Sequence, residues 1–429
     1  MDNYIKNPKF WLLIAALILT FLLVYSPHFN YPYPLHIDEW MHIEYAKNFS
    51  RLSPVDIAKV HPEFGYQLIL DFLFKLGLSI TTYKFLPAIF AVFAGTFLFL
   101  LLFRLTKNYW ISLFSIIFFA SLPSNVNLLG LWFAVPLTLS IPLMYLFFCF
   151  FTQAIHEESY KKNIILAGII LLVISTIHAS SAAFIFLILI IYSAINYTEL
   201  KKKPAISLIF LPFLILSIIA FYIFWKENFA STLNIIINII KFESSSSLLE
   251  PSLTQNPLTF QFGKNIILIN QYFLPVLYGI LPFILAMFGL YYSLKTRKLR
   301  IFSIWFLTTA FLLLIFNIID ISFLARRQRM TYYALLSLAP LSAIGLYKLI
   351  NYIRNKLINN LVNQKTISII LTIILAITLI ATFYNYGKQQ QGTELYYVID
   401  NADYQALVFL SQQEKGLVLA PLKEAATVY

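Results

Sequence analysis

Long apolar runs separated by short polar segments make up most of the 429-residue chain. A helix needs roughly 20 apolar residues to cross about 30 Å of hydrocarbon, and about eleven runs approach that length. The predicted spans cover approximately residues 10–26, 83–103, 109–122, 131–152, 164–178, 181–197, 205–225, 268–292, 301–319, 331–349 and 367–384. The pattern therefore predicts an all-α polytopic membrane protein, with a transmembrane domain over residues 1–384.

Three segments outside these spans are long enough to carry structure of their own. Residues 27–82 form a first loop with two stretches of helical apolar spacing, which we expect to lie along the membrane interface; the second stretch, 66–78, is alternatively a twelfth span. The serine-containing segment 226–265 is predicted to be a mobile loop. Residues 385–429 combine helical patterns with one strand pattern and indicate the start of an outer α/β domain, which we expect to continue beyond Tyr429.

Composition and charge support the membrane interpretation. Hydrophobic residues make up 60% and charged residues 12% of the chain, whereas a soluble domain carries about a quarter charged residues. The net charge is +12, and clusters of lysine and arginine follow every second span, as the positive-inside rule requires. This distribution places residues 27–82 outside. It indicates contact with anionic membrane lipids and no nucleic-acid partner.

The first candidate site is the acidic pair Asp38 and Glu39, with His36 and His42 beside it. Adjacent carboxylates near a membrane surface suit general-base work on an acceptor hydroxyl, because a low dielectric raises the pKa of one member of the pair. If Asp38 opens a helix, His42 lies one turn along on the same face. A structural explanation competes, since the helix dipole favours acidic residues in a first turn.

A second candidate is the sequence His61, Pro62, Glu63. Proline fixes the backbone at the entry to the next predicted helix, and His61 and Glu63 are candidates for binding a sugar or positioning the acidic pair. An ordinary helix start explains the same residues. Four of the six histidines lie in the first outer loop, so a metal site is conceivable, but no spacing matches a metal motif and we assign no metal ligand.

The third candidate is an arginine turn formed by Arg326, Arg327 and Arg329 between two late spans. Its charges lie outside, against the positive-inside rule. Arginine forks match phosphate oxygens bidentately, so the turn is predicted to bind a phosphate or diphosphate at the outer interface. Snorkelling to outer headgroups, or pairing with Asp320, is the competing explanation.

In these features the chain resembles the membrane glycosyltransferases of the C-type (GT-C) fold, particularly the protein O-mannosyltransferase and aminoarabinose transferase branch. The resemblance rests on LHIDEWMHIEYAKNF after the first span, VHPEFGYQLILDFLFKLG before the second and FLARRQRMTYYALLSLAPLSAIGL late in the chain. It extends to most of the chain in layout, but in residues only to the first loop and the arginine turn. The sequence departs from the relatives at His61-Pro62-Glu63, where they favour Pro-Pro.

The tail sequence ADYQALVFLSQQEKGLVLAP is similar to the beginning of the outer domain in archaeal oligosaccharyltransferase-like proteins. The acceptor motif WWDYG of true oligosaccharyltransferases is absent from the sequence.

The resemblance implies an inverting glycosyltransferase (hexosyl- or pentosyltransferase) of the cell envelope, with its active site on the outer side of the cell membrane. The implied donor is a polyprenyl-phosphate-linked sugar, and the acceptor is a protein, lipid or glycan. Asp38 would be the base that deprotonates the acceptor and Glu39 the second acid, while Arg326, Arg327 or Arg329 would hold the lipid phosphate. No cofactor is expected, except a divalent cation (Mg²⁺ or Mn²⁺) if the chain works as an oligosaccharyltransferase does. Two alternatives stay open: oligosaccharyltransferase-like transfer from a lipid diphosphate, and a non-enzymatic flippase or carrier of lipid-linked sugars.

Overall fold

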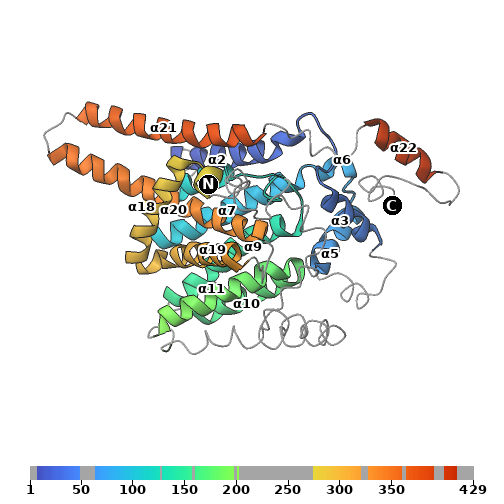
Figure 1. Cartoon of the computed structure of the whole chain (residues 1–429), viewed down its shortest axis with the longest axis horizontal. Coiled ribbons are helices and arrows are strands. Elements are labelled where there is room, and N and C mark those ends of the chain that lie inside the picture. The colour runs from blue at the N-terminus through green and yellow to red at the C-terminus, as the bar shows by residue number, and fades with distance from the viewer. Residues whose placement is uncertain are drawn as a thin grey trace.

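The computed structural model of the chain describes residues 7–48, 63–125, 128–156, 160–197, 201, 274–319, 327–359, 364–390 and 401–412. These residues form helices and connecting turns, with no strand among them (Figure 1). The α-helices are α2 (Pro8–Tyr25), α3 (Ile37–Asn48), α5 (Phe64–Lys75), α6 (Ile80–Tyr83), α7 (Leu86–Thr106), α8 (Tyr109–Ala120), α9 (Pro136–His156), α10 (Tyr160–Ile177), α11 (Ala179–Ile195), α17 (Leu274–Tyr278), α18 (Ile280–Lys295), α19 (Arg300–Ile319), α20 (Arg327–Asn359), α21 (Gln364–Gln390) and α22 (Asn401–Ser411).

The predicted apolar spans that the structure describes coincide largely with helices, although residues 131–135 of the span 131–152 precede α9 and are not helical. In the described part, six helical stretches are long and apolar enough to cross a membrane, judged by length and composition, and three shorter apolar helices accompany them. The structure thus supports an all-helical, multi-pass membrane protein. The count of eleven spans stays a prediction, and the predicted span 205–225 lies outside the described residues.

Polar residues between α7 and α8 show how the sequence ends one helix and starts the next. Lys107 follows α7 in the left-handed conformation, with φ of 53°. The Asn108 side chain then accepts hydrogen bonds from the backbone N–H groups of Trp110 and Ile111, which the first turn of a helix leaves without helical partners. The connection is therefore short, and α7 and α8 pack as neighbours.

The bundle has a buried centre and helices at its edge. The apolar stretch of α20 is 78% buried, whereas that of α21 is 17% buried. Helix α21 lies along one side of the bundle near α2 (Figure 1), where the Tyr386 hydroxyl donates to the backbone oxygen of Leu23. Ile369, Ile373 and Ile377 are exposed at one-turn spacing on α21, as expected for a face that meets lipid.

The closest contact between helices joins α18 to α20 and depends on two glycines. A Cβ atom at Gly289 would lie 1.8 Å from the backbone oxygen of Leu341, and one at Gly345 would lie 1.8 Å from that of Leu285. Any residue other than glycine therefore forces the two helices apart. Small residues that let helix backbones approach in this way are typical of helix pairs in membranes.

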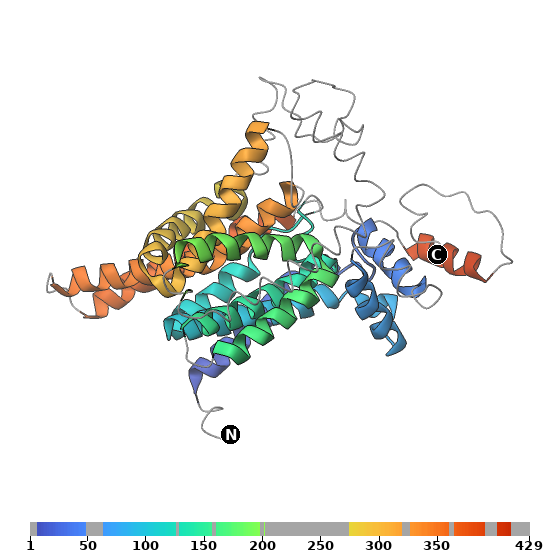
Figure 2. The ribbon, with the colours of Figure 1, turned by 90° about the horizontal axis from the view of Figure 1, so that it is seen from below.

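Helices α3 and α5 lie together at one end of the bundle, with α22 beyond them (Figure 2). Gly65, in the first turn of α5, lies so close to α10 that a Cβ atom there would be 2.4 Å from Thr176 Oγ1. The ring of Tyr404 on α22 is 4.8 Å from that of Tyr33 in the segment before α3. Helix α22 agrees with the helix predicted at the start of the tail, but the predicted strand after it and the loop 226–265 lie outside the described residues.

Helix α5 has apolar residues on opposite sides. Tyr66 and Leu70 are buried in the core, while Leu68, Phe72 and Leu76 are exposed at one-turn spacing. This is the arrangement expected of a helix that packs on protein with one face and on a membrane interface with the other. It supports the interfacial alternative for residues 66–78 over a twelfth span.

The glycine contact leads to a first prediction. Gly345→Ala should lower the midpoint of thermal unfolding in detergent, because overpacking a close contact costs about 1–3 kcal/mol. Gly168→Ala on α10 is the matched control, since a Cβ there meets no atom within 4 Å and alanine favours a helix by about 1 kcal/mol over glycine. Equal midpoints for the two variants would contradict the proposed contact.

Candidate active site

Glu39 faces the protein interior and holds backbone groups in place. Its side chain is fully buried. One carboxylate oxygen, Oε2, accepts from the N–H groups of Leu35 and His36 at 2.8 and 2.9 Å, and the other, Oε1, accepts from Ala134 N–H at 2.7 Å. Burial raises the pKa of Glu39 to about 7, against the hydrogen bonds from these three N–H groups, which lower it.

The peptide groups of Ala134 join α3 to the bundle. Its N–H donates to Glu39, and its backbone oxygen accepts from the hydroxyls of Tyr66 and Tyr83 at 2.5 and 2.7 Å. All four residues are fully buried. These hydrogen bonds connect the segment between α8 and α9 to α3, α5 and α6, so these elements position one another.

Asp38, one residue before Glu39, points in another direction and is half-exposed. Its side chain has 40% of its area accessible, and one oxygen lies 3.6 Å from His36 Nδ1. His36 Nδ1 also accepts from the Asp38 backbone N–H at 3.1 Å. Burial lowers the pKa of His36, with Asp38 opposing and Arg329 reinforcing the effect. A neutral His36 that accepts at Nδ1 carries its proton on Nε2, so the Asp38 carboxylate remains available to a substrate.

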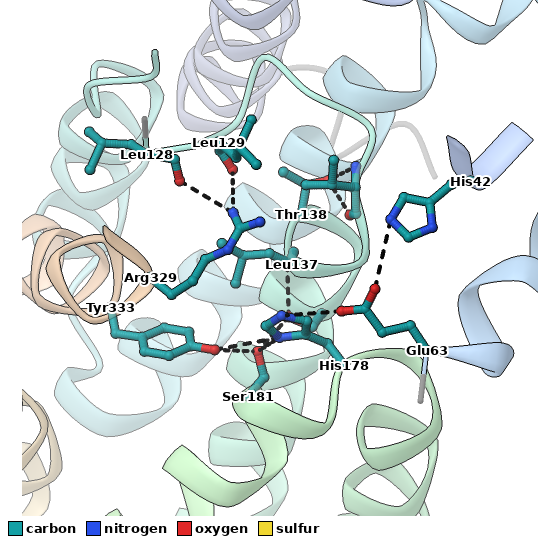
Figure 3. Close-up of polar contacts among 12 residues, drawn as sticks. His42, Glu63, Leu128, Leu129, Leu137, Thr138, His178, Ser181, Arg329 and Tyr333 are labelled. Atoms are coloured by element: carbon teal, nitrogen blue, oxygen red, sulfur yellow. Dashed lines mark hydrogen bonds and ion pairs between the residues drawn. The ribbon is translucent and has the colours of Figure 1, made fainter. Parts of the chain in front are cut away.

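Glu63, just before α5, lies between two histidines (Figure 3). One carboxylate oxygen is 3.7 Å from His42 Nε2, and the other is 3.7 Å from His178 Nε2. Burial raises the pKa of Glu63 to about 7; Arg329 opposes this shift and Asp38 adds to it. Glu63 therefore lies within electrostatic reach of both Asp38 and Arg329.

His178, in the turn between α10 and α11, belongs to a group of buried hydroxyls. Its Nδ1 is 2.7 Å from Ser181 Oγ, which lies 2.8 Å from the Tyr333 hydroxyl and 2.9 Å from Ser140 Oγ. Figure 3 shows this group on the side of His178 opposite Glu63. The hydroxyls come from α9, α11 and α20, so three helices fix the orientation of the imidazole ring.

Arg329, in the first turn of α20, is the cation of the site. Its Nη1 donates to the backbone oxygens of Leu128 and Leu129, both at 3.4 Å (Figure 3). These contacts are at the long end of hydrogen-bond distances, so a phosphate oxygen is a stronger acceptor for the same guanidinium.

The structure brings together five of the predicted site residues: His36, Asp38, His42, Glu63 and Arg329. Glu39 is adjacent but turned inward. His61, Arg326 and the side chain of Arg327 lie outside the described residues.

The sequence alone predicted no role for Ser181, Tyr333 and Ala134, and none for His178. The sequence does contain a feature that points to His178 and Ser181. His178 and Ser181 interrupt two apolar runs at a turn on the predicted outer side, and such residues mark sites in membrane proteins. The role of Ala134 depends on its backbone and leaves no such signal.

The donor groups of the site do not form a metal site among the described residues. No group of three His, Cys, Asp or Glu side chains is placed there to hold one ion. The two histidines approach different oxygens of Glu63 and do not converge on one point.

The fold of the chain is similar to that of a protein of known structure. No protein family matches the chain, and no curated protein does so. Among solved structures, the chain is similar to the oligosaccharyltransferase of Archaeoglobus fulgidus, crystallised with an acceptor peptide containing the NVT sequon tethered by a disulfide bond. The TM-score is 0.63 at 16% identity, over 96% of this chain and 58% of that protein. The chain thus has the oligosaccharyltransferase-like form of the GT-C fold and spans a little over half the length of this relative.

The hydrogen bonds of Glu39 lead to a second prediction. Glu39→Gln should lower the thermal midpoint in detergent by an amount equivalent to about 1–3 kcal/mol, because an amide accepts at one end only and leaves buried N–H groups facing its NH₂. Glu44→Gln is the control on the same helix, since Glu44 is part-buried and its pKa is raised by burial without hydrogen bonds. A variant of Glu39 as stable as the control would show that this carboxylate does not hold the segment.

Proposed function

We propose that the protein is an inverting glycosyltransferase that transfers a sugar from a polyprenyl-phosphate-linked donor to an acceptor on the outer face of the membrane. One observation carries the proposal: Arg329 lies beside the pair of His178 and Glu63 (Figure 3), and Glu63 also contacts His42 on α3, the helix that carries Asp38 in its first turn. Helices far apart in the sequence thus supply the proposed base and the proposed phosphate-binding cation. The oligosaccharyltransferase-like fold supports the same reaction class.

Asp38 has the exposure and orientation needed for the base. Its carboxylate would accept the proton of an acceptor hydroxyl as the acceptor oxygen bonds to the anomeric carbon. The bond from that carbon to the phosphate oxygen breaks on the opposite face, and its electron pair leaves with the lipid phosphate. Attack from the opposite face inverts the anomeric centre, and no acid is needed for a phosphate leaving group.

Arg329 would stabilise the negative charge that the phosphate gains as it leaves. A phosphate oxygen is a stronger acceptor for this guanidinium than the carbonyls of Leu128 and Leu129, which it contacts at 3.4 Å. Electrostatic stabilisation of developing charge is commonly the largest single contribution to such catalysis. Asp38 and Arg329 would therefore act at opposite ends of the reacting bond.

A second candidate is oligosaccharyltransferase-like transfer from a lipid diphosphate to a peptide. The fold similarity favours it, because the relative was crystallised with an acceptor peptide. The two candidates differ in their products: a lipid monophosphate is released from the first donor, and a lipid diphosphate from the second.

The role of Asp38 gives a third prediction. Asp38→Asn should reduce sugar transfer by about 100-fold or more, the usual contribution of a general base, while expression and thermal midpoint stay unchanged because the side chain is half-exposed. Membranes containing each variant would receive a panel of radiolabelled polyprenyl-phosphate- and polyprenyl-diphosphate-linked sugars, and label would be counted in protein, lipid and glycan fractions. Glu44→Gln is the matched control on α3, and full transfer by the Asp38 variant would end the proposal.

The role of Arg329 gives a fourth prediction. Arg329→Gln should raise the KM for the lipid-linked donor by about 10-fold or more, since a hydrogen bond to a charged group contributes about 1.5–3 kcal/mol. Arg354→Gln is the matched control, because Arg354 is exposed elsewhere on the same helix. An unchanged donor KM in the Arg329 variant would show that Arg329 does not bind the donor, whatever the effect on acceptor binding.

A further inference from the structure

The buried hydroxyls beside His178 contain enough hydrogen bonds to place every proton among them. Ser140 Oγ donates to the backbone oxygen of Leu137 at 2.7 Å. A serine hydroxyl has one hydrogen to donate, so Ser140 is only an acceptor in its 2.9 Å contact with Ser181. Ser181 therefore donates its own hydrogen to Ser140.

With its hydrogen used, Ser181 Oγ is an acceptor toward its two remaining neighbours. It accepts from the Tyr333 hydroxyl at 2.8 Å and from His178 Nδ1 at 2.7 Å. A neutral His178 then carries its proton on Nδ1. The opposite assignment, with Ser181 donating to His178, costs one hydrogen bond, because Ser140 then either gives up its bond to Leu137 or faces Ser181 with a lone pair.

This tautomer determines whether His178 presents a proton or a lone pair to Glu63. His178 Nε2 presents a lone pair toward Glu63 Oε1 at 3.7 Å. This distance is too long for a hydrogen bond, but the lone pair of Nε2 would face the negative charge of a carboxylate, which is unfavourable, whereas a neutral carboxylic acid avoids that repulsion. The hydroxyl chain (Ser140, Ser181 and Tyr333) thus favours the protonated form of Glu63.

Other groups around Glu63 act in both directions. Burial and the negative charge of Asp38 favour the protonated form, and Arg329 favours the carboxylate; the resulting pKa is about 7. Among the residues that the structure describes, the titratable or charged groups that face Glu63 from the surrounding elements are Asp38 and His42 on α3, Tyr66 on α5, His178 before α11, and Arg329 and Tyr333 on α20.

We propose that Glu63 admits the donor phosphate only as a neutral carboxylic acid, the form that His178 and the hydroxyl chain favour. The inference rests on the proposed function, since it assigns Arg329 to the donor phosphate. A neutral Glu63 leaves the charge of Arg329 available to that phosphate. Once ionised, Glu63 repels the phosphate and competes for the same cation. No covalent bond forms or breaks in this step, and the proton stays on Glu63.

The first test, which is the fifth prediction, measures binding of farnesyl phosphate to the full chain in detergent. From about pH 6 to about pH 8, wild-type affinity should fall about tenfold more than that of Glu63→Gln, whose amide is a neutral isostere of the acid. Titration of the ligand phosphate affects both proteins equally and cancels in the comparison. The same pH dependence in both proteins would overturn the proposal.

The second test observes the proton without any ligand. Infrared difference spectra across the same pH range should contain carboxylic-acid C=O bands that titrate near neutrality from both Glu39 and Glu63. The band of Glu63 is the one that Glu63→Gln removes. Ser181→Ala should move that band to a lower midpoint. Without Ser181, the Tyr333 hydroxyl finds His178 Nδ1 as an acceptor, already 3.5 Å away, so the imidazole carries its proton on Nε2 and presents it to a Glu63 carboxylate.

Ser175→Ala is the matched control for this second test. Ser175 loses the same hydroxyl, bonded to the Leu172 backbone oxygen on α10, outside the hydroxyl chain, and its band should not move. A band that is absent from the wild type, or that Ser181→Ala leaves in place, would overturn the inference. If the band behaves as expected but the wild type does not bind farnesyl phosphate, the donor site of the proposed function fails, and with it the gating role of Glu63; the assignment of the proton stands.

Discussion

The buried backbone N–H and C=O of Ala134 are the constraint on which the arrangement of the site depends. A backbone N–H or C=O removed from water without a partner costs several kcal/mol in an apolar surrounding. Here the N–H is satisfied by Glu39 and the carbonyl by two tyrosines. These partners come from α3, α5 and α6. The hydrogen bonds to the backbone of this one residue therefore fix the position of all three helices relative to the bundle. Asp38 and Glu63 lie at the ends of the elements so placed.

Much of the layout could be predicted from the sequence, because apolar run length and charge placement depend only on local composition. The helical first loop and the residues Asp38, Glu63 and Arg329 were predicted for the same reason. The directions of Asp38 and Glu39 could not be. Successive residues on a helix point about 100° apart, so adjacent acids face different surroundings, and only the packed bundle decides which of them is buried. The contributions of Ser181 and Tyr333 depend on contacts across more than 150 residues of sequence.

The three carboxylates of the site differ in what surrounds them, and this difference separates their roles. Glu39 is surrounded by backbone N–H groups, which do not titrate. Glu63 is flanked by imidazoles and has a charged arginine within reach, so its protonation responds to conditions and to ligands. Asp38 is open enough to meet a substrate. Carboxylates placed in unlike environments commonly divide structural, acid and base functions among themselves.

The contacts made by main-chain atoms also bear on how relatives of this chain can be found. The oxygens of Leu285 and Leu341 meet the backbone of the opposite helix at Gly345 and Gly289, and Ala134 contributes only its peptide groups. Main-chain atoms are common to all residue types, so a lineage can replace the flanking side chains freely while these contacts persist. The two glycines cannot be replaced in the first contact, since every other amino acid carries a Cβ, and the contacts of Ala134 require its glutamate and tyrosine partners. The fold can therefore be retained after most of the sequence has changed. We expect a search for Gly289, Gly345 and Glu39 to find distant relatives better than a search by overall identity.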